Sequence, residues 1–444
     1  MQGHISIPEP AGAGRDATSR RKRRKRCLVA AFARLLFAAL LFGKAAVAQE
    51  ALRSSLAGQY ALEAKKRQIS SGWGDVHLGP VNLDLQAQLA IEASDNVRYR
   101  EADKEGDLIF RPGVSVQALW PVTEKNRLSL GFGLGYAKCV RNADLDYLYL
   151  TPDSNIGFDL YVGDFVINFH DRFHYTHDVA SQPSLSGRGS YGRFDNSLGV
   201  LSTWDLNKAV ISLNYDHLSY LSTESDLSFV DHTSELVGLR TAWLVTPATP
   251  VGLELGFGTT DYNQDIARAN NLDDLIHYSF GAFYEVPAGK FSSLRLAGGY
   301  AIYEPTSHVN TNAASGGIMD AVYAELAWNH RITQHVGYSI SAGQQLQAGV
   351  YAEMLKLLYV RTVVTWNILR GYGLSNSFGY ENGTQGLLTA VERFERYSAG
   401  ISVSKRLGQK LSTAAGYNFL YRTSDLAGNN YVQNQLVLSV SYSF

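Results

Sequence analysis

The last ten residues, Gln435–Phe444, constrain the fold of this chain more than any other segment. Every second side chain is large and apolar: Leu436, Leu438, Val440, Tyr442 and Phe444. Small serines stand between the last four of them. A period of two, with one apolar face and one small polar face, is typical of a strand whose two sides meet different surroundings. The chain therefore ends in an amphipathic β-strand.

The same alternation recurs along most of the chain. In 127–139, large apolar residues alternate with serine and glycine, and 251–258 and 275–287 repeat the pattern. The periodicity predicts 18 strands, with 16 as the alternative count: 81–95, 107–121, 127–139, 154–163, 165–177, 194–205, 209–222, 233–246, 251–263, 275–287, 291–304, 318–332, 336–349, 358–369, 372–381, 394–406, 410–422 and 431–444. Short turns connect them at one end and longer polar loops at the other.

These strands are long enough for tilted spans of about 9–11 residues each. No stretch after residue 48 approaches the roughly 18 apolar residues of a membrane helix. Only closed β-structure can otherwise span lipid, because lipid offers backbone N–H and C=O groups no partner. The 26 Tyr, 19 Phe and 41 Gly also favour strands and tight turns over helices. The sequence predicts an all-β fold, a transmembrane antiparallel up-and-down barrel over residues 81–444.

The amino end has the order of an export signal. A basic run, Arg20–Arg26, precedes an apolar run, Leu28–Phe42, and a small-x-small site at Ala46–Ala48. This order predicts a cleaved signal peptide over residues 1–48. A nucleic-acid-binding patch is the competing interpretation of the basic run, and a membrane helix that of the apolar run, which is short for a span and carries Arg34. Residues 49–80 are then a periplasmic extension or a short plug.

The composition and motifs of the chain after residue 48 limit which classes of function it can have. It has more acidic than basic residues, which argues against a nucleic-acid partner. Its single cysteine, Cys139, excludes an intramolecular disulfide. Gly-x-Ser-x-Gly, His-Glu-x-x-His and P-loop motifs are missing. His170 and His174 share one strand face but lie about 13 Å apart, too far to bind one metal. We therefore expect no catalytic residue, no cofactor and no metal site, and a chain that is not an enzyme.

Charged residues on the polar face of the predicted strands are candidates for lining a water-filled lumen, because unpaired charges cannot form a dry core. The candidates are Arg111, Arg172, Arg240, Glu254, Glu285, Arg295, Glu325, Arg331, Arg361, Arg396, Arg406 and Arg422. Two interpretations stay open. One is a basic wall that guides an acidic polymer, and the other is a solvated lumen whose mixed charges pair across strands.

Large aromatic residues near strand ends are candidates for a membrane girdle, since their rings are apolar and their tips polar. These are Trp120, Trp204, Trp243, Trp328, Trp366, Tyr442 and Phe444. No predicted loop between strands exceeds about 16 residues, so a long constriction loop is not expected. The sequence predicts a wide bore unless residues 49–80 plug it.

Three stretches carry a family resemblance. His77–Pro80 leads into the first strand, and Phe110–Val114 reads Phe-Arg-Pro-Gly-Val; Asn126–Tyr136 then reads Asn-Arg-Leu-Ser-Leu-Gly-Phe-Gly-Leu-Gly-Tyr. The chain resembles the outer-membrane β-barrel, porin-like family associated with exopolysaccharide biosynthesis and export. The closing strand also resembles those that the barrel-assembly machinery reads.

The resemblance implies an outer-membrane pore for exopolysaccharide export. Its implied partners are outer-membrane lipid, the polysaccharide, a periplasmic polysaccharide-export protein and the barrel-assembly machinery. The alternative is a general diffusion porin for small solutes. A third hypothesis, an outer-membrane hydrolase, requires a nucleophile and a base that converge in the folded chain.

Overall fold

The computed structural model describes residues 76–263, 272–306, 319–348, 350, 354–368, 371–386 and 391–444. The predicted signal peptide, 1–48, and residues 49–75 of the predicted extension lie outside the described residues. Among the described residues, no helix is long and apolar enough to cross a membrane.

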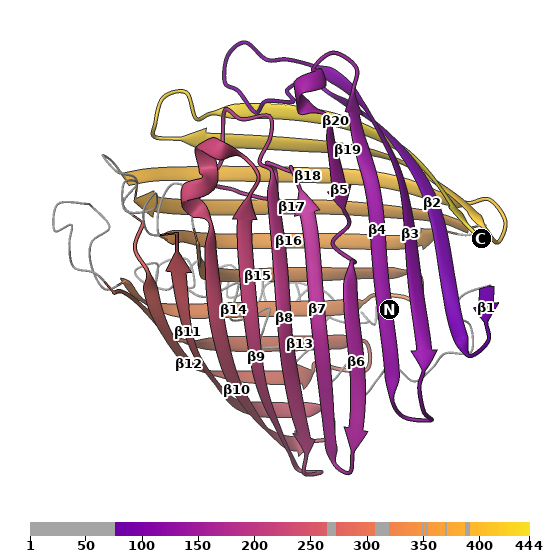
Figure 1. Ribbon diagram of the computed structural model, residues 1–444, viewed down its shortest axis with the longest axis vertical. Coiled ribbons are helices and arrows are strands. Elements are labelled where there is room, and N and C mark those ends of the chain that lie inside the picture. The colour runs from indigo at the N-terminus through magenta and orange to yellow at the C-terminus, as the bar shows by residue number, and fades with distance from the viewer. Residues whose placement is uncertain are drawn as a thin grey trace, which may run out of the picture. The chain divides into compact units, whose positions relative to one another are not determined.

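Strands make up 74% of the described residues (Figure 1). The first ten are β1 (Val76–Leu78), β2 (Val81–Ser94), β3 (Asp107–Pro121), β4 (Arg127–Cys139), β5 (Tyr147–Leu150), β6 (Asn155–Val162), β7 (Phe165–Thr176), β8 (Arg193–Asp205), β9 (Ala209–Ser222) and β10 (His232–Thr246). The next ten are β11 (Thr249–Tyr262), β12 (Leu275–Pro287), β13 (Ser292–Pro305), β14 (Met319–Arg331), β15 (Val336–Ala348), β16 (Met354–Ile368), β17 (Tyr372–Gly386), β18 (Val391–Arg406), β19 (Leu411–Ser424) and β20 (Tyr431–Ser443). Two short 3-10 helices, η1 (Ala143–Leu145) and η2 (Ser225–Val230), lie in loops.

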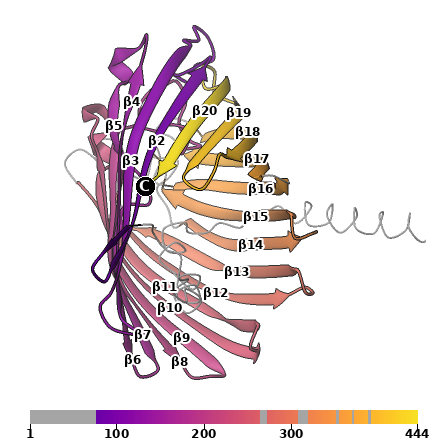
Figure 2. The same cartoon turned by 90° about the vertical axis from the view of Figure 1, so that its right-hand side faces the viewer.

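The strands form one closed antiparallel barrel with 18 strand positions. β5 and β6 share one position, because both pair with β4 on one side and with β7 on the other. β1 pairs with the start of β2. β20 pairs with β2 and closes the circuit, as Figure 2 shows where the last strand meets the first. Closure gives each strand from β2 to β20 a partner on both sides, which lipid requires. The predicted fold is therefore confirmed, with 18 strand positions and not 16.

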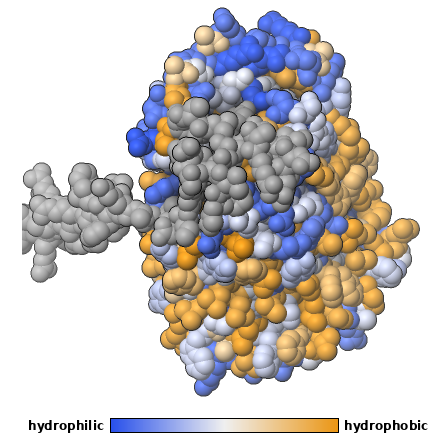
Figure 3. Space-filling view, turned by 60° about the vertical axis from the view of Figure 1, so that its left-hand side comes forward, coloured by the Kyte–Doolittle hydropathy of each residue, from blue (hydrophilic) through white to orange (hydrophobic). Residues whose placement is uncertain are grey.

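The outer surface of the barrel is apolar over a broad band (Figure 3). Alternate strand residues point outward and are exposed, among them Leu213, Leu253, Phe280, Leu436 and Leu438. Figure 3 shows this band over the lower part of the barrel and a hydrophilic surface at the upper rim. An exposed apolar band of this kind matches lipid and not water.

On the inner face, glycines let large side chains lie flat against the wall. Tyr149 packs on Gly135, where a Cβ would overlap its ring, and Tyr323 packs on both Gly281 and Gly299 in the same way. The glycine-and-aromatic alternation of the sequence thus has a packing role. It keeps bulky rings out of the centre of the lumen.

The strands differ from the prediction in two regions of the chain. β5 lies inside the predicted loop 140–153, and β16, β17 and β18 extend further toward the loop end than predicted. Leu355, Leu357 and Phe394 form a buried cluster on these extensions. Packing inside the barrel therefore extends these strands beyond the amphipathic pattern that predicted them.

Candidate functional site: the barrel lumen

The strand register places the predicted lumen candidates on the inner face of the barrel. Arg240 pairs with Glu254 across β10 and β11, and both side chains are nearly buried, whereas their neighbours Leu239 and Leu253 point the other way. Arg331 and Arg406 are exposed at strand ends on the side of the short turns. The remaining candidates lie between these ends and the loop side.

Five of the candidates form one ion-pair network on β10–β14. The Arg240 guanidinium lies 2.8 Å from Glu285 and 3.3 Å from Glu254. Arg295 lies 2.6 Å from Glu285, 3.3 Å from Glu254 and 3.9 Å from Glu325. Because this network contains three carboxylates and two guanidiniums, its charges are mixed and mutually compensated.

A second group lies on β16–β19. Glu381 receives Arg361 at 3.0 Å and Arg396 at 2.6 Å. Glu392 receives Arg422 at 2.8 Å, and both of these side chains are almost completely buried. Removing one partner of such a pair leaves a buried charge without compensation. The group is therefore part of the wall's architecture.

Further pairs compensate the basic side chains on the rest of the wall. Arg111 lies 2.8 Å from Glu92, Arg127 lies 3.3 Å from Asp159, and Arg193 lies 3.0 Å from Asp195. Of the two interpretations of the predicted polar face, this pairing supports a lumen whose mixed charges pair across strands. It does not support a basic wall that guides an acidic polymer.

Residues 177–192, here called the strap, connect β7 to β8 and cross the lumen. The Arg396 Nη1 atom donates to the carbonyl of Ala180 at 2.7 Å. The Arg422 Nε atom donates to the carbonyl of Pro183 at 3.2 Å. β18 and β19 lie far around the barrel from β7 and β8. The strap therefore reaches from one wall to the facing wall.

Other contacts fix the strap close to where it leaves β7 and returns to β8. Arg188 pairs with Glu224 at 2.9 Å, and Glu224 also accepts a hydrogen bond from Ser190 at 2.7 Å. His177 contacts the Ser190 hydroxyl at 2.8 Å. Burial lowers the pKa of His177 below its ordinary value, which keeps the ring neutral at neutral pH.

The strap also contributes to an apolar core inside the loop end of the barrel. Its residues Val179, Leu185 and Tyr191 are buried in a cluster with apolar residues of other loops and strands, including Leu227 and Tyr303. The predicted wide bore is therefore wrong. The strap is of ordinary loop length, and its inward course depends on packing and on the two arginines of the opposite wall.

Two cavities flank the strap. One, of about 480 Å³, is lined by Tyr220, His232, Tyr262, His277, Tyr303 and neighbouring residues. The other, of about 520 Å³, is lined by Glu92, Arg111, Tyr149, Gln435 and residues around them. Pro152, His174 and Ser181 contribute to both, so the cavities adjoin there. Each has the volume of a small-molecule site.

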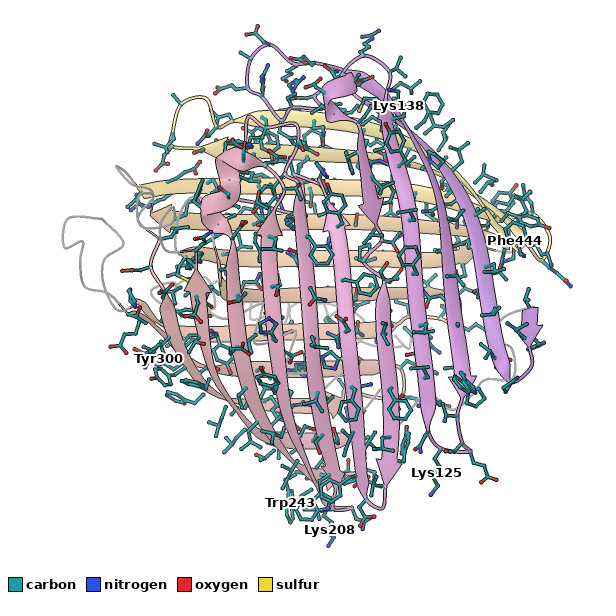
Figure 4. The ribbon with its side chains drawn as sticks, viewed as in Figure 1. Lys125, Lys138, Lys208, Trp243, Tyr300 and Phe444 are labelled. Atoms are coloured by element: carbon teal, nitrogen blue, oxygen red, sulfur yellow. The ribbon has the colours of Figure 1, made fainter. Side chains whose placement is uncertain are left out.

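The predicted girdle residues lie together at the end of the barrel that carries the short turns. Figure 4 shows Trp243 there, near Lys208 and Lys125, with Lys138 at the opposite end. The other six are also within a few residues of that end: Trp120, Trp204, Trp328, Trp366, Tyr442 and Phe444. Six of the seven are exposed, and Trp328 is half-buried.

A second aromatic belt, whose tyrosines the predicted girdle does not include, lies six to nine residues from the turn ends of the strands. Outward-facing tyrosines there donate to polar side chains: Tyr215 to Glu235 at 2.6 Å, Tyr397 to Glu395 at 2.9 Å and Tyr417 to Asn434 at 2.6 Å. A tyrosine ring in lipid with its hydroxyl on a polar partner marks a membrane boundary. Strand alternation together with a polar residue on the next strand is the signal that could have identified this belt.

Within the described residues, no group of three or more histidine, cysteine or carboxylate side chains could hold a metal ion.

Comparison with known proteins finds barrels of similar architecture. OpdQ of Pseudomonas aeruginosa is 10% identical with a TM-score of 0.47, covering 83% of this chain and 100% of that chain. A BenF-like porin from Pseudomonas fluorescens Pf-5 is 10% identical with a TM-score of 0.48, covering 84% and 100%. Pseudomonas aeruginosa OpdK, solved with vanillate, is 8% identical with a TM-score of 0.46, covering 84% and 100%. Similarity at this level identifies neither a solute nor a mechanism for this chain. No family model and no curated protein matches the sequence.

The predicted function, export of exopolysaccharide, is wrong. A polymer in transit needs an open bore, and the strap crosses the lumen and leaves cavities of small-molecule size beside it. The predicted partners, a polysaccharide and a polysaccharide-export protein, depended on this function and are not supported either. The resemblance that implied them holds for the barrel fold alone.

Proposed function

We propose that the chain is an outer-membrane diffusion channel for small solutes. The observation that carries the proposal is the strap across the lumen, with a cavity of about 500 Å³ on each side of it. Passages of this size suit molecules of a few rings or less. The apolar outer band and the two aromatic belts support a position in a bilayer.

The predicted ends of the chain fit the same proposal. A signal peptide over 1–48 would take the chain to the periplasm, and the closing strand with its terminal Phe444 would engage the barrel-assembly machinery. Residues 49–80 would remain on the periplasmic side, because β2 begins at the end of the barrel that carries the short turns. The lumen-lining residues act in this proposal by size and polarity, without chemistry of their own.

Reconstitution of the purified chain into liposomes tests the channel directly. We expect rapid swelling in isotonic monosaccharides or amino acids and little swelling in a dextran, because the strap leaves only narrow passages. The measurement is the initial swelling rate as a function of solute mass. If the liposomes swell in none of these solutes, the proposal is contradicted. It is also contradicted if they swell as fast in dextran as in monosaccharides or amino acids.

Charge compensation on the wall predicts weak ion selectivity. Potassium and chloride permeabilities, measured from the reversal potential in a salt gradient, are expected to be similar. Replacing Glu254 and Glu285 by glutamine uncovers the charges of Arg240 and Arg295, so the channel should become anion-selective. The same substitution at Glu124, which is exposed in a turn, is the matched control. Strong selectivity of the unmodified channel would show that the pairing does not neutralise the path.

A further inference from the structure

A polar cluster interrupts the apolar outer wall of the barrel on β9 and β10. His217 and Glu235 point outward with side chains that are 36% and 43% exposed. Apolar residues surround them on the same face, including Leu213, Leu221 and Val237, all exposed. Ionisable groups on the lipid side of a barrel are costly at the bilayer centre and tolerated near its interfaces, so the depth of this cluster decides what it can meet.

Three side chains in this cluster are connected in a defined order. The Ser219 hydroxyl lies 3.3 Å from Nε2 of His217. The other ring nitrogen, Nδ1, lies 2.7 Å from Oε1 of Glu235. The Tyr215 hydroxyl donates to the second Glu235 oxygen at 2.6 Å, which fixes the carboxylate. A hydroxyl, an imidazole and a carboxylate in this order form the nucleophile, base and orienting group of acyl transfer.

Strand geometry produces the arrangement. His217 and Ser219 are two residues apart on β9, so both face outward. The register pairs His217 with Glu235 on β10. Ser219 itself stands between Asn196 of β8 and Thr233 of β10. The Asn196 amide already donates to Asp171 and to the Arg172 carbonyl, so the Thr233 hydroxyl is the candidate donor to an oxyanion.

Other histidines of the described chain make different contacts. His170 lies inside the lumen between Asn168 and Asp216. His177 contacts the Ser190 hydroxyl, but its second nitrogen meets the Tyr175 hydroxyl. At His217 the ring has a serine on one nitrogen and a carboxylate on the other, and the group faces outward.

The distance of the cluster from the turn-side belt fits the depth of lipid ester bonds. Trp243, in the turn-side belt, pairs with Ala209 at the start of β9. At roughly 3.3 Å per residue, His217 is about 26 Å further along the strand. A tilt of about 40° reduces this to about 20 Å across the membrane, close to the height of the apolar band. Tyr215 of the second belt lies next to the cluster and donates to Glu235.

We propose that Ser219, His217 and Glu235 form a hydrolytic site for acyl esters of membrane lipids, which reach it laterally from the bilayer. This activity goes beyond the channel function and is independent of the lumen. Ser219 and His217 are the catalytic residues, and Glu235 is a positioning residue that orients the imidazole.

The reaction balances with water as the only co-reactant. The Ser219 oxygen attacks the ester carbonyl carbon while Nε2 of His217 takes the hydroxyl proton. The C–O bond to the glycerol or sugar oxygen breaks, and His217 returns the proton to that leaving oxygen. Water then attacks the acyl-serine with His217 again as base. The fatty acid is released, and the proton returns to Ser219.

The test uses the purified full chain with two readouts. A fluorophosphonate probe should label Ser219, identified by mass spectrometry, and vesicles of phosphatidylethanolamine or of lipid A should release free fatty acid. Comparing the two vesicles shows which lipid is the source of the ester. Ser219→Ala should abolish labelling, and His217→Gln should lower hydrolysis by about 10²–10⁴-fold. Glu235→Ala should slow labelling and Glu235→Asp should restore part of it, because the carboxylate orients the imidazole.

Ser202→Ala is the matched control. Ser202 also faces outward, on β8, where its register partner is Leu213 rather than a histidine. It should label and hydrolyse like the unmodified chain. Conductance measured on the same preparations separates the two proposals, since Ser219→Ala should leave it unchanged. Normal conductance without labelling or fatty-acid release from the unmodified chain overturns the hydrolytic site alone.

Discussion

Replacing Arg396 and Arg422 together by alanine is expected to raise the single-channel conductance severalfold. The strap leaves the wall at β7 and β8. These two side chains, on β18 and β19 across the lumen, donate hydrogen bonds to its carbonyls at Ala180 and Pro183. A hydrogen bond from a charged donor contributes about 1.5–3 kcal/mol. Since 1.4 kcal/mol is a tenfold change in an equilibrium, losing both shifts the strap strongly toward positions away from that wall. Planar-bilayer recording measures the effect.

Arg361→Ala provides the matched control for this substitution. Arg361 pairs with the same Glu381 carboxylate as Arg396, at 3.0 Å. Its loss therefore removes a positive charge from the same wall without removing a contact to the strap. Its conductance should stay close to that of the unmodified channel. If the double variant conducts like Arg361→Ala, the strap is not what limits the passage.

The barrel could be predicted from the sequence because each strand carries its own signal. The predicted ranges 107–121, 127–139, 209–222 and 275–287 coincide with β3, β4, β9 and β12. Lipid on one side and water on the other impose alternation at every position of a span. An even number of such spans, joined by turns at one end and loops at the other, then determines the topology.

The course of the strap could not be predicted in the same way. Its contacts to the opposite wall join residues 216 and 239 positions apart in the chain. Such contacts depend on the diameter of the closed barrel and on which arginines face each other across it. Periodicity identified Arg396 and Arg422 as inward-facing, but not as the partners of two backbone carbonyls.

The outer-face cluster has the same limitation at shorter range. His217 and Ser219, two residues apart on β9, lie on one face of the strand. Glu235 joins them only through the register between β9 and β10, which the intervening loop does not reveal. The sequence therefore showed no catalytic motif, although the folded chain brings a nucleophile, a base and a carboxylate together.

Gly252→Ala is expected to destabilise the barrel by about 3 kcal/mol or more, at the upper end of what overpacking costs. A Cβ on Gly252 would overlap the carbonyl oxygen of Thr241 on the neighbouring strand. Because this neighbour is backbone, no rotation of a side chain can relieve the overlap. β10 and β11 must separate locally, and the Arg240–Glu254 pair lies next to the site.

Gly337→Ala tests whether the effect comes from close contact rather than from the loss of any strand glycine. The nearest atom to a Cβ at Gly337 is 3.6 Å away, which is an ordinary distance. Alanine there should be tolerated, and it also restricts the unfolded chain more than glycine does. Denaturant unfolding in detergent and the heat-dependent mobility of the folded barrel on gels compare the two variants. Equal stability of both would mean that β10 and β11 can move apart at little cost, and that the wall there does not hold the ion-pair network rigidly in place.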